Sequence, residues 1–108
     1  MKYIAPSILS ANFGHLANDI HMTNESDADW LHIDVMDGLF VPSISFGMPV
    51  IQSIRKVSNM FFDVHLMITE PMRYLEEFVK AGADGITVHA EACEDLKATV
   101  LKVKELGV

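Results

Sequence analysis

Two apolar segments carry imidazole and carboxylate side chains at alternate positions. His32 and Asp34 alternate with apolar residues in segment 30–35, and Asp63 and His65 do the same in segment 61–66. Side chains two apart along a β-strand project from the same face, and the residues between them project from the other. The spacing therefore predicts two strands with one apolar face and one face that carries His and Asp.

The set His32, Asp34 and His65 has the composition of a metal site. Two imidazoles and one carboxylate suit Zn²⁺, Mn²⁺, Fe²⁺ or Co²⁺, and three protein ligands leave a position for a substrate. A lone His-x-Asp pair on a strand is more often an ordinary polar pair. His65 on a second strand makes the two interpretations about equally good, so spacing alone leaves both open.

The elements that must position these residues follow from four apolar segments that alternate with four helical patterns. Asn12 and Thr69 are expected to cap helix N-termini, and Gly82 suits a left-handed C-terminal position. The predicted strands span residues 3–9, 30–36, 61–67 and 85–89, and the predicted helices span about 12–23, 49–57, 70–81 and 94–106.

Strict alternation of strands and helices predicts right-handed βαβ units and a parallel sheet. A doubly wound open sheet and the first units of a barrel both fit this pattern. Neither G-x-G-x-x-G nor G-x-x-x-x-G-K-S/T follows the first segment, so a nucleotide-binding open sheet loses support. Polar residues near the carboxyl ends of strands favour a barrel, because barrel enzymes place their catalytic groups there.

Composition limits the possible partners and compartments. The formal charge of −7 argues against nucleic acid or an anionic membrane as a partner, since both would be repelled. A small anionic substrate stays possible, because local cations or helix N-termini can bind phosphate. Cys93 is the only cysteine, and neither a signal segment nor a long apolar run is present. We therefore expect a cytoplasmic protein.

Longer motifs resemble the ribulose-phosphate 3-epimerase family. They read Ala-Pro-Ser-Ile-Leu-Ser at 5–10, His-Ile-Asp-Val-Met-Asp-Gly at 32–38 with Phe-Val-Pro at 40–42, Asp-Val-His-Leu-Met at 63–67, and Ala-Gly-Ala-Asp at 81–84. The resemblance covers the whole chain in order. Family members are roughly twice this length and form complete parallel (β/α)8 TIM barrels. It therefore implies that residues 1–108 are the N-terminal half of a single catalytic domain, with about four βα units.

The resemblance also implies a role for each site residue. His32, Asp34 and His65 would bind one divalent transition metal (Zn, Mn, Fe or Co), with a further aspartate from the other half. Asp34 would be one of two opposed acid/base groups at C3 of a phosphorylated ketose. Ser7, His65, Met36 and Met67 would contact the substrate, the methionines as polarizable walls that carry no proton.

Further interpretations concern residues near this set. Asp63 is expected to be a network carboxylate rather than a catalyst, Asp37 to order the loop beside Gly38, and His89 to be a structural residue at the barrel mouth. Residues 1–108 alone should show negligible turnover, because one base, one ligand and the phosphate site would lie elsewhere. Open sheet edges lead us to expect assembly, and a homo-oligomer for the whole protein.

Four positions depart from the family pattern, namely Asn12, Leu39, Ser43 and Ala90. None is a proposed ligand. They leave allulose 6-phosphate as an alternative substrate to ribulose 5-phosphate. Two further alternatives are another barrel isomerase or aldolase with the same metal set, and a non-catalytic half-barrel that serves as a binding or assembly module.

Overall fold

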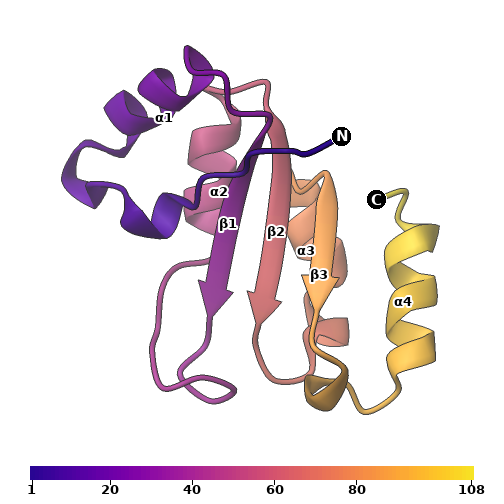
Figure 1. The fold of residues 1–108 in the computed structure, drawn as a ribbon. Coiled ribbons are helices and arrows are strands. Elements are labelled where there is room, and N and C mark those ends of the chain that lie inside the picture. Colours follow the sequence, from indigo (N-terminus) through magenta and orange to yellow (C-terminus); the bar gives the residue numbers. More distant parts are fainter.

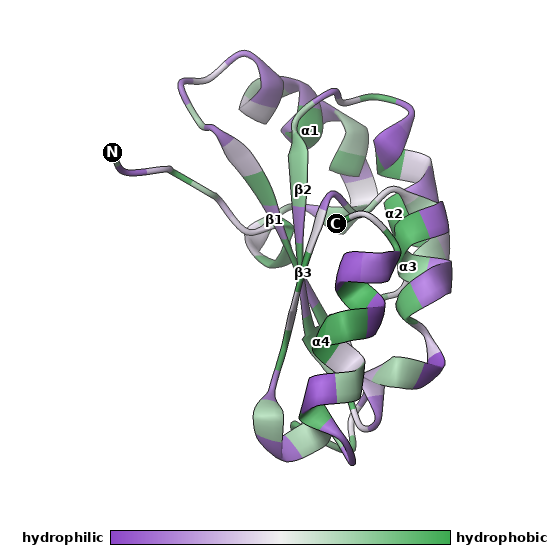
Figure 2. Ribbon diagram, turned by 90° about the vertical axis from the view of Figure 1, so that its right-hand side faces the viewer, coloured by the Kyte–Doolittle hydropathy of each residue, from purple (hydrophilic) through white to green (hydrophobic).

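The computed structural model describes all of residues 1–108 and contains a three-stranded parallel sheet in the order β1-β2-β3. The strands are β1 (Trp30–Met36), β2 (Phe61–Met67) and β3 (Gly85–Val88), and the helices are α1 (Leu16–Asn24), α2 (Met48–Arg55), α3 (Leu75–Ala81) and α4 (Leu96–Glu105). Helices α2, α3 and α4 lie on one side of the sheet (Figures 1 and 2). The predicted α/β class and parallel sheet are confirmed, and the arrangement is that of part of a TIM barrel.

The predicted first strand at residues 3–9 is wrong as a regular strand. The segment runs beside β1 and makes one parallel bridge, between Ser7 and His32. Its carbonyl groups at Ile4 and Pro6 accept hydrogen bonds from the backbone of residues 29, 30 and 32. Pro6 has no N–H to donate, and Ser7 begins a 3-10 turn over Ile8–Ser10 by accepting the Leu9 N–H on its side chain. The segment therefore takes the place of a strand without forming a ladder.

Two helix starts also differ from the prediction. Asn12 does cap a turn by accepting the Gly14 N–H, but this turn is the 3-10 segment Phe13–His15, and α1 follows it. Thr69 caps nothing. Glu70 adopts a left-handed conformation at φ 50° before the 3-10 turn Pro71–Arg73, and α3 begins only at Leu75. None of the helices is both long and apolar enough to cross a membrane.

The alternation along β1 and β2 separates the core from the opposite face of the sheet. The buried side chains form part of a core of 15 residues and include Leu31, Ile33, Val35, Phe62, Val64 and Leu66. The residues between them are partly exposed in both strands, and Phe61 at the start of β2 is exposed. Apolar burial against the helices, worth about 25 cal/mol per Å², thus fixes which face presents the polar side chains.

The register between β1 and β2 stacks this polar face into four levels. Trp30 pairs with Phe61, His32 with Asp63, Asp34 with His65, and Met36 with Met67. At the first level the ring of Trp30 stacks between those of Tyr3 and Phe61, with centroid separations of 4.8 and 4.6 Å. The face therefore begins with aromatic rings, passes through two levels of His and Asp, and ends with thioethers.

Arg55 at the end of α2 secures the amino-terminal ends of β2 and β3. Its guanidinium donates to the carbonyl groups of Ser58, Met60 and Gly82 and to the Asp84 carboxylate. It also lies 3.6 Å from the centroid of the Phe62 ring. One side chain thus satisfies three carbonyl groups and ties two loops to the sheet, which holds the strands in the register that the site requires.

Candidate metal centre

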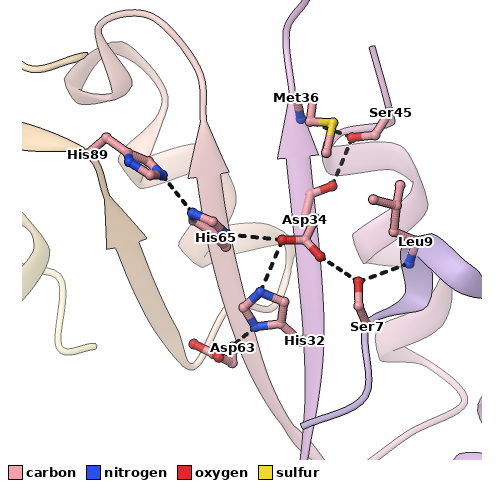
Figure 3. Close-up of polar contacts among 9 residues, drawn as sticks. All are labelled: Ser7, Leu9, His32, Asp34, Met36, Ser45, Asp63, His65 and His89. Atoms are coloured by element: carbon pink, nitrogen blue, oxygen red, sulfur yellow. Dashed lines mark hydrogen bonds and ion pairs between the residues drawn. The ribbon is translucent and has the colours of Figure 1, made fainter. Parts of the chain in front are cut away.

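The carboxylate of Asp34 lies at the centre of the polar face (Figure 3). Its Oδ1 atom is 3.1 Å from His32 Nε2 and 3.0 Å from His65 Nδ1. Its Oδ2 atom accepts a hydrogen bond of 2.5 Å from the Ser7 hydroxyl. Adjacent strands and the N-terminal segment thus converge on one carboxyl group, as the sequence predicted for His32, Asp34 and His65.

The atoms of this cluster fit a divalent metal ion. One nitrogen of His32, one of His65 and one carboxylate oxygen of Asp34 all lie within 4.8 Å of one another. The side chains of His32, Asp34 and His65 are 26%, 14% and 23% exposed, so the cluster is sheltered but reachable from the open face. Two imidazoles and a carboxylate are the donor set of Zn²⁺, Mn²⁺, Fe²⁺ and Co²⁺ sites. The three residues form a cluster that could hold such an ion.

Each imidazole of the cluster has a partner at its distal nitrogen. His32 Nδ1 lies 2.8 Å from Asp63 Oδ2, and His65 Nε2 lies 2.7 Å from His89 Nε2. Such contacts fix the tautomer and ring orientation of metal-binding histidines. The contact with His32 is the one expected of Asp63 as a network carboxylate. The contact between His65 and His89 was not predicted, because nothing in segment 85–89 specifies which neighbouring side chain His89 meets.

The surroundings of Asp34 favour its ionised form. Partial burial acts to raise the pKa of this carboxyl group, but hydrogen bonds from Ser7 and His65 and the charges of His32 and His65 lower it, and the net pKa lies below the ordinary value. Asp34 is therefore a carboxylate at neutral pH, as both metal binding and proton acceptance require.

Asp37 orders the loops above the cluster, as predicted. Its Oδ1 atom accepts the N–H groups of Leu39 and Phe40, and its Oδ2 atom accepts the N–H of Thr69 at 2.7 Å. The loop after β1 is thereby joined to the loop after β2. Ser45, which the sequence did not single out, accepts the Met36 N–H and donates to the Asp34 carbonyl. It holds the end of β1 directly beside the Asp34 side chain.

We expect Asp37→Asn to lower stability in a pH-dependent way. Partial burial raises the pKa of Asp37, but the N–H groups of Thr69, Leu39 and Phe40 lower it below the ordinary value of 3.8. A lowered folded-state pKa contributes stability above the unfolded-state pKa, and that stability is lost as pH falls through the folded-state pKa. The variant should therefore cost about 1 kcal/mol at pH 7, where one oxygen acceptor is lost, and progressively less below about pH 4.

Urea unfolding of the full-length protein at several pH values measures this difference. Asp27→Asn is a matched control, because Asp27 is exposed and its side chain makes no hydrogen bond. An Asp37→Asn cost that stays constant between pH 7 and pH 3 would contradict the prediction.

The remaining predicted site residues lie around the cluster. Ser7 contacts Asp34 directly. Met36 and Met67 are paired across β1 and β2 on the face that carries Asp34 and His65, one level nearer the carboxyl ends of the strands. The side chains that the sequence selected are thus neighbours, and their arrangement leaves the methionines above the carboxylate.

A parallel sheet backed by helices, with this cluster near the carboxyl ends of its strands, defines part of an α/β barrel with a candidate metal centre at its mouth. Residues 3–108 match the Ribulose-phosphate 3 epimerase family, and the chain belongs to that family.

Curated relatives agree with this assignment. The chain is 52% identical over its full length to ribulose-phosphate 3-epimerase of Bacillus subtilis (strain 168), of which it covers 50%. It is 50% identical to that of Synechocystis sp. over 96% of the chain and 46% of the relative. It is 45% identical to a chloroplastic ribulose-5-phosphate-3-epimerase of Arabidopsis thaliana over 96% of the chain and 38% of the relative. The chain thus spans about half the length of these relatives or less.

Proposed function

We propose that residues 1–108 form the N-terminal half of one (β/α)8 catalytic domain, which interconverts ribulose 5-phosphate and xylulose 5-phosphate. The observation that carries the proposal is the Asp34 carboxylate, shared by His32 and His65 on adjacent strands. The names of the relatives support the pentose phosphate over allulose 6-phosphate as substrate. The activity belongs to the whole barrel, because this chain spans about half of it.

Epimerisation beside a ketone removes the C3 proton from one face and returns a proton to the other. Asp34 is the base on one face, and its lowered pKa keeps it ionised and ready to accept the proton. The opposed base lies outside these residues, since Asp63, the other carboxylate beside the cluster, is engaged by His32. Asp34 then holds the abstracted proton while the opposite face is protonated.

In this proposal His32 Nε2, Asp34 Oδ1 and His65 Nδ1 hold one divalent transition metal (Zn, Mn, Fe or Co). The bound ion supplies Lewis-acid stabilisation of the negative charge that develops on the substrate oxygens. Distal contacts to Asp63 and His89 keep the two imidazoles directed at the centre. Ser7 orients the Asp34 carboxylate, which presents the other oxygen to the cluster.

In this proposal Ser7 and His65 also contact the sugar, and Met36 and Met67 enclose the reacting carbon. Thioethers exclude water without offering a proton, so protons would move only through the carboxylates. The homo-oligomeric state and the cytoplasmic location stay predictions, and one relative is described as chloroplastic.

The test is exchange of the C3 proton of ribulose 5-phosphate in D₂O, followed by NMR. The full-length protein should incorporate deuterium at C3 and form xylulose 5-phosphate. Residues 1–108 expressed alone should form negligible xylulose 5-phosphate, because the opposed base and the phosphate site are absent. Faster exchange with allulose 6-phosphate would move the assignment to that substrate, and absence of exchange with both would exclude an epimerase.

A further inference from the structure

We propose that His89 is a positioning residue for the metal centre, and that it acts as the hydrogen-bond acceptor that fixes the tautomer of His65. The inference rests on the proposed metal centre formed by His32, Asp34 and His65. It concerns the nitrogen of His65 that lies away from that centre, where His89 Nε2 is 2.7 Å from His65 Nε2.

Proton counting sets the direction of this hydrogen bond. A neutral imidazole carries one proton, and the nitrogen that binds a metal must present a lone pair. His65 Nδ1 is the nitrogen beside Asp34 Oδ1, to which it donates in the metal-free structure. A metal ion between the two atoms would displace that proton, so in the loaded centre Nδ1 is the ligand atom and Nε2 carries the proton. His65 Nε2 therefore donates, and His89 Nε2 must accept. His89 then carries its own proton on Nδ1, which lies 3.7 Å from the Glu91 carboxylate.

The two imidazoles of the cluster therefore have different kinds of hydrogen-bond partner. Asp63 can only accept from His32 Nδ1, so the tautomer of His32 is fixed by a carboxylate at 2.8 Å. The partner of His65 is an imidazole, which can either donate or accept. His65 can keep its proton on Nε2 only when His89 has its own proton on Nδ1. The Glu91 carboxylate, 3.7 Å from His89 Nδ1, favours this placement.

The surroundings of His89 keep its ring in place. Its ring lies against that of His65, with centroids 4.9 Å apart and an interplanar angle of 28°, and Phe40 lies on it at 5.0 Å. The backbone is held as well, since the His89 carbonyl accepts from the Cys93 thiol and from the Ala92 N–H. The side chain is 35% exposed, but it is enclosed on two sides by rings. His89 is therefore oriented well enough to act on His65.

Two substitutions separate acceptance of a hydrogen bond from packing. His89→Gln places an amide oxygen near the position of His89 Nε2, where it can accept the hydrogen bond. His89→Leu fills the same space but offers no acceptor. In the full-length protein, His89→Leu should weaken Zn²⁺ binding by about 10- to 100-fold, whereas His89→Gln should stay close to wild type. Competition with a chromophoric chelator measures the affinity, and thermal unfolding of the metal-free proteins checks that both variants fold.

The tautomers are read directly from long-range ¹H–¹⁵N correlations of the histidine side chains in the Zn²⁺-loaded protein. We expect the proton of His65 on Nε2 and that of His89 on Nδ1. A proton on Nε2 of His89 in the loaded protein would overturn the inference, as would equal affinities of wild type and His89→Leu, or equal losses in both variants. Wild-type protein that binds no metal would instead overturn the proposed metal centre itself.

Discussion

Asp34→Asn is expected to lower C3 exchange by the full-length protein about 10³- to 10⁴-fold. The amide cannot accept the C3 proton, and general-base catalysis alone contributes about 10²- to 10⁴-fold. The same change removes the negative charge that His32 and His65 face at 3.1 and 3.0 Å. Proton acceptance and metal binding therefore fail together, which is why this substitution should have the largest effect of any in the chain.

Asp63→Asn is the matched control, because it makes the same chemical change one level lower on the same face. Asp63 touches His32 and not the reacting centre, so its loss should weaken metal binding by about 10- to 100-fold. Saturating metal should restore exchange in Asp63→Asn and leave Asp34→Asn inactive. If saturating metal restored both variants equally, Asp34 would be a ligand only and its role as a base would be wrong.

Removal of the metal from the full-length protein should lower C3 exchange by at least about 10³-fold. Lewis-acid stabilisation is worth several kcal/mol, and each 1.36 kcal/mol corresponds to about tenfold in rate. The cluster offers two imidazole nitrogens and one carboxylate oxygen, so exchange should be restored by ions that accept mixed nitrogen and oxygen ligands. The measurement is C3 exchange after dialysis against a chelator, and again after addition of Zn²⁺, Mn²⁺, Fe²⁺, Co²⁺ or Mg²⁺ to separate samples.

We expect the first four ions to restore exchange and Mg²⁺ to fail, because Mg²⁺ prefers an octahedral set of oxygen ligands. Far-UV circular dichroism of the metal-free protein controls for loss of fold. Full activity in a folded protein that retains no metal would exclude the proposed role of the cluster, whatever Asp34 does.

The sequence predicted β1 and β2 to the residue, and with them the cluster. In both segments hydrophobic residues alternate with His and Asp, so one pattern specifies the strand and also the face of each side chain. Asp34 and His65 then meet because parallel neighbours align at the same level. The resemblance to a family added the roles, which spacing alone had left open.

The sequence-based predictions were wrong or incomplete where neighbouring residues or contacts distant in sequence determined the local structure. Residues 3–9 are apolar enough for a strand, but Pro6 lacks a donor and Ser7 bonds to its own turn. Thr69 suits a helix cap, yet Glu70 after it adopts a left-handed conformation, and α3 begins only at Leu75. The partner of His65 depends on where the chain after β3 places His89, and no short-range pattern carries that information.

The four levels across β1 and β2 are expected to serve different purposes, according to their position along the strands. At one end Trp30 stacks with Tyr3 and Phe61, which contributes to folding. At the other end Met36 and Met67 would meet the substrate of the proposed epimerase. The two levels of His and Asp between them would carry the proposed chemistry. Substitutions at Met36 and Met67 should therefore act on the choice of sugar, and substitutions at Trp30 and Phe61 on stability, while the His and Asp levels between them stay the same.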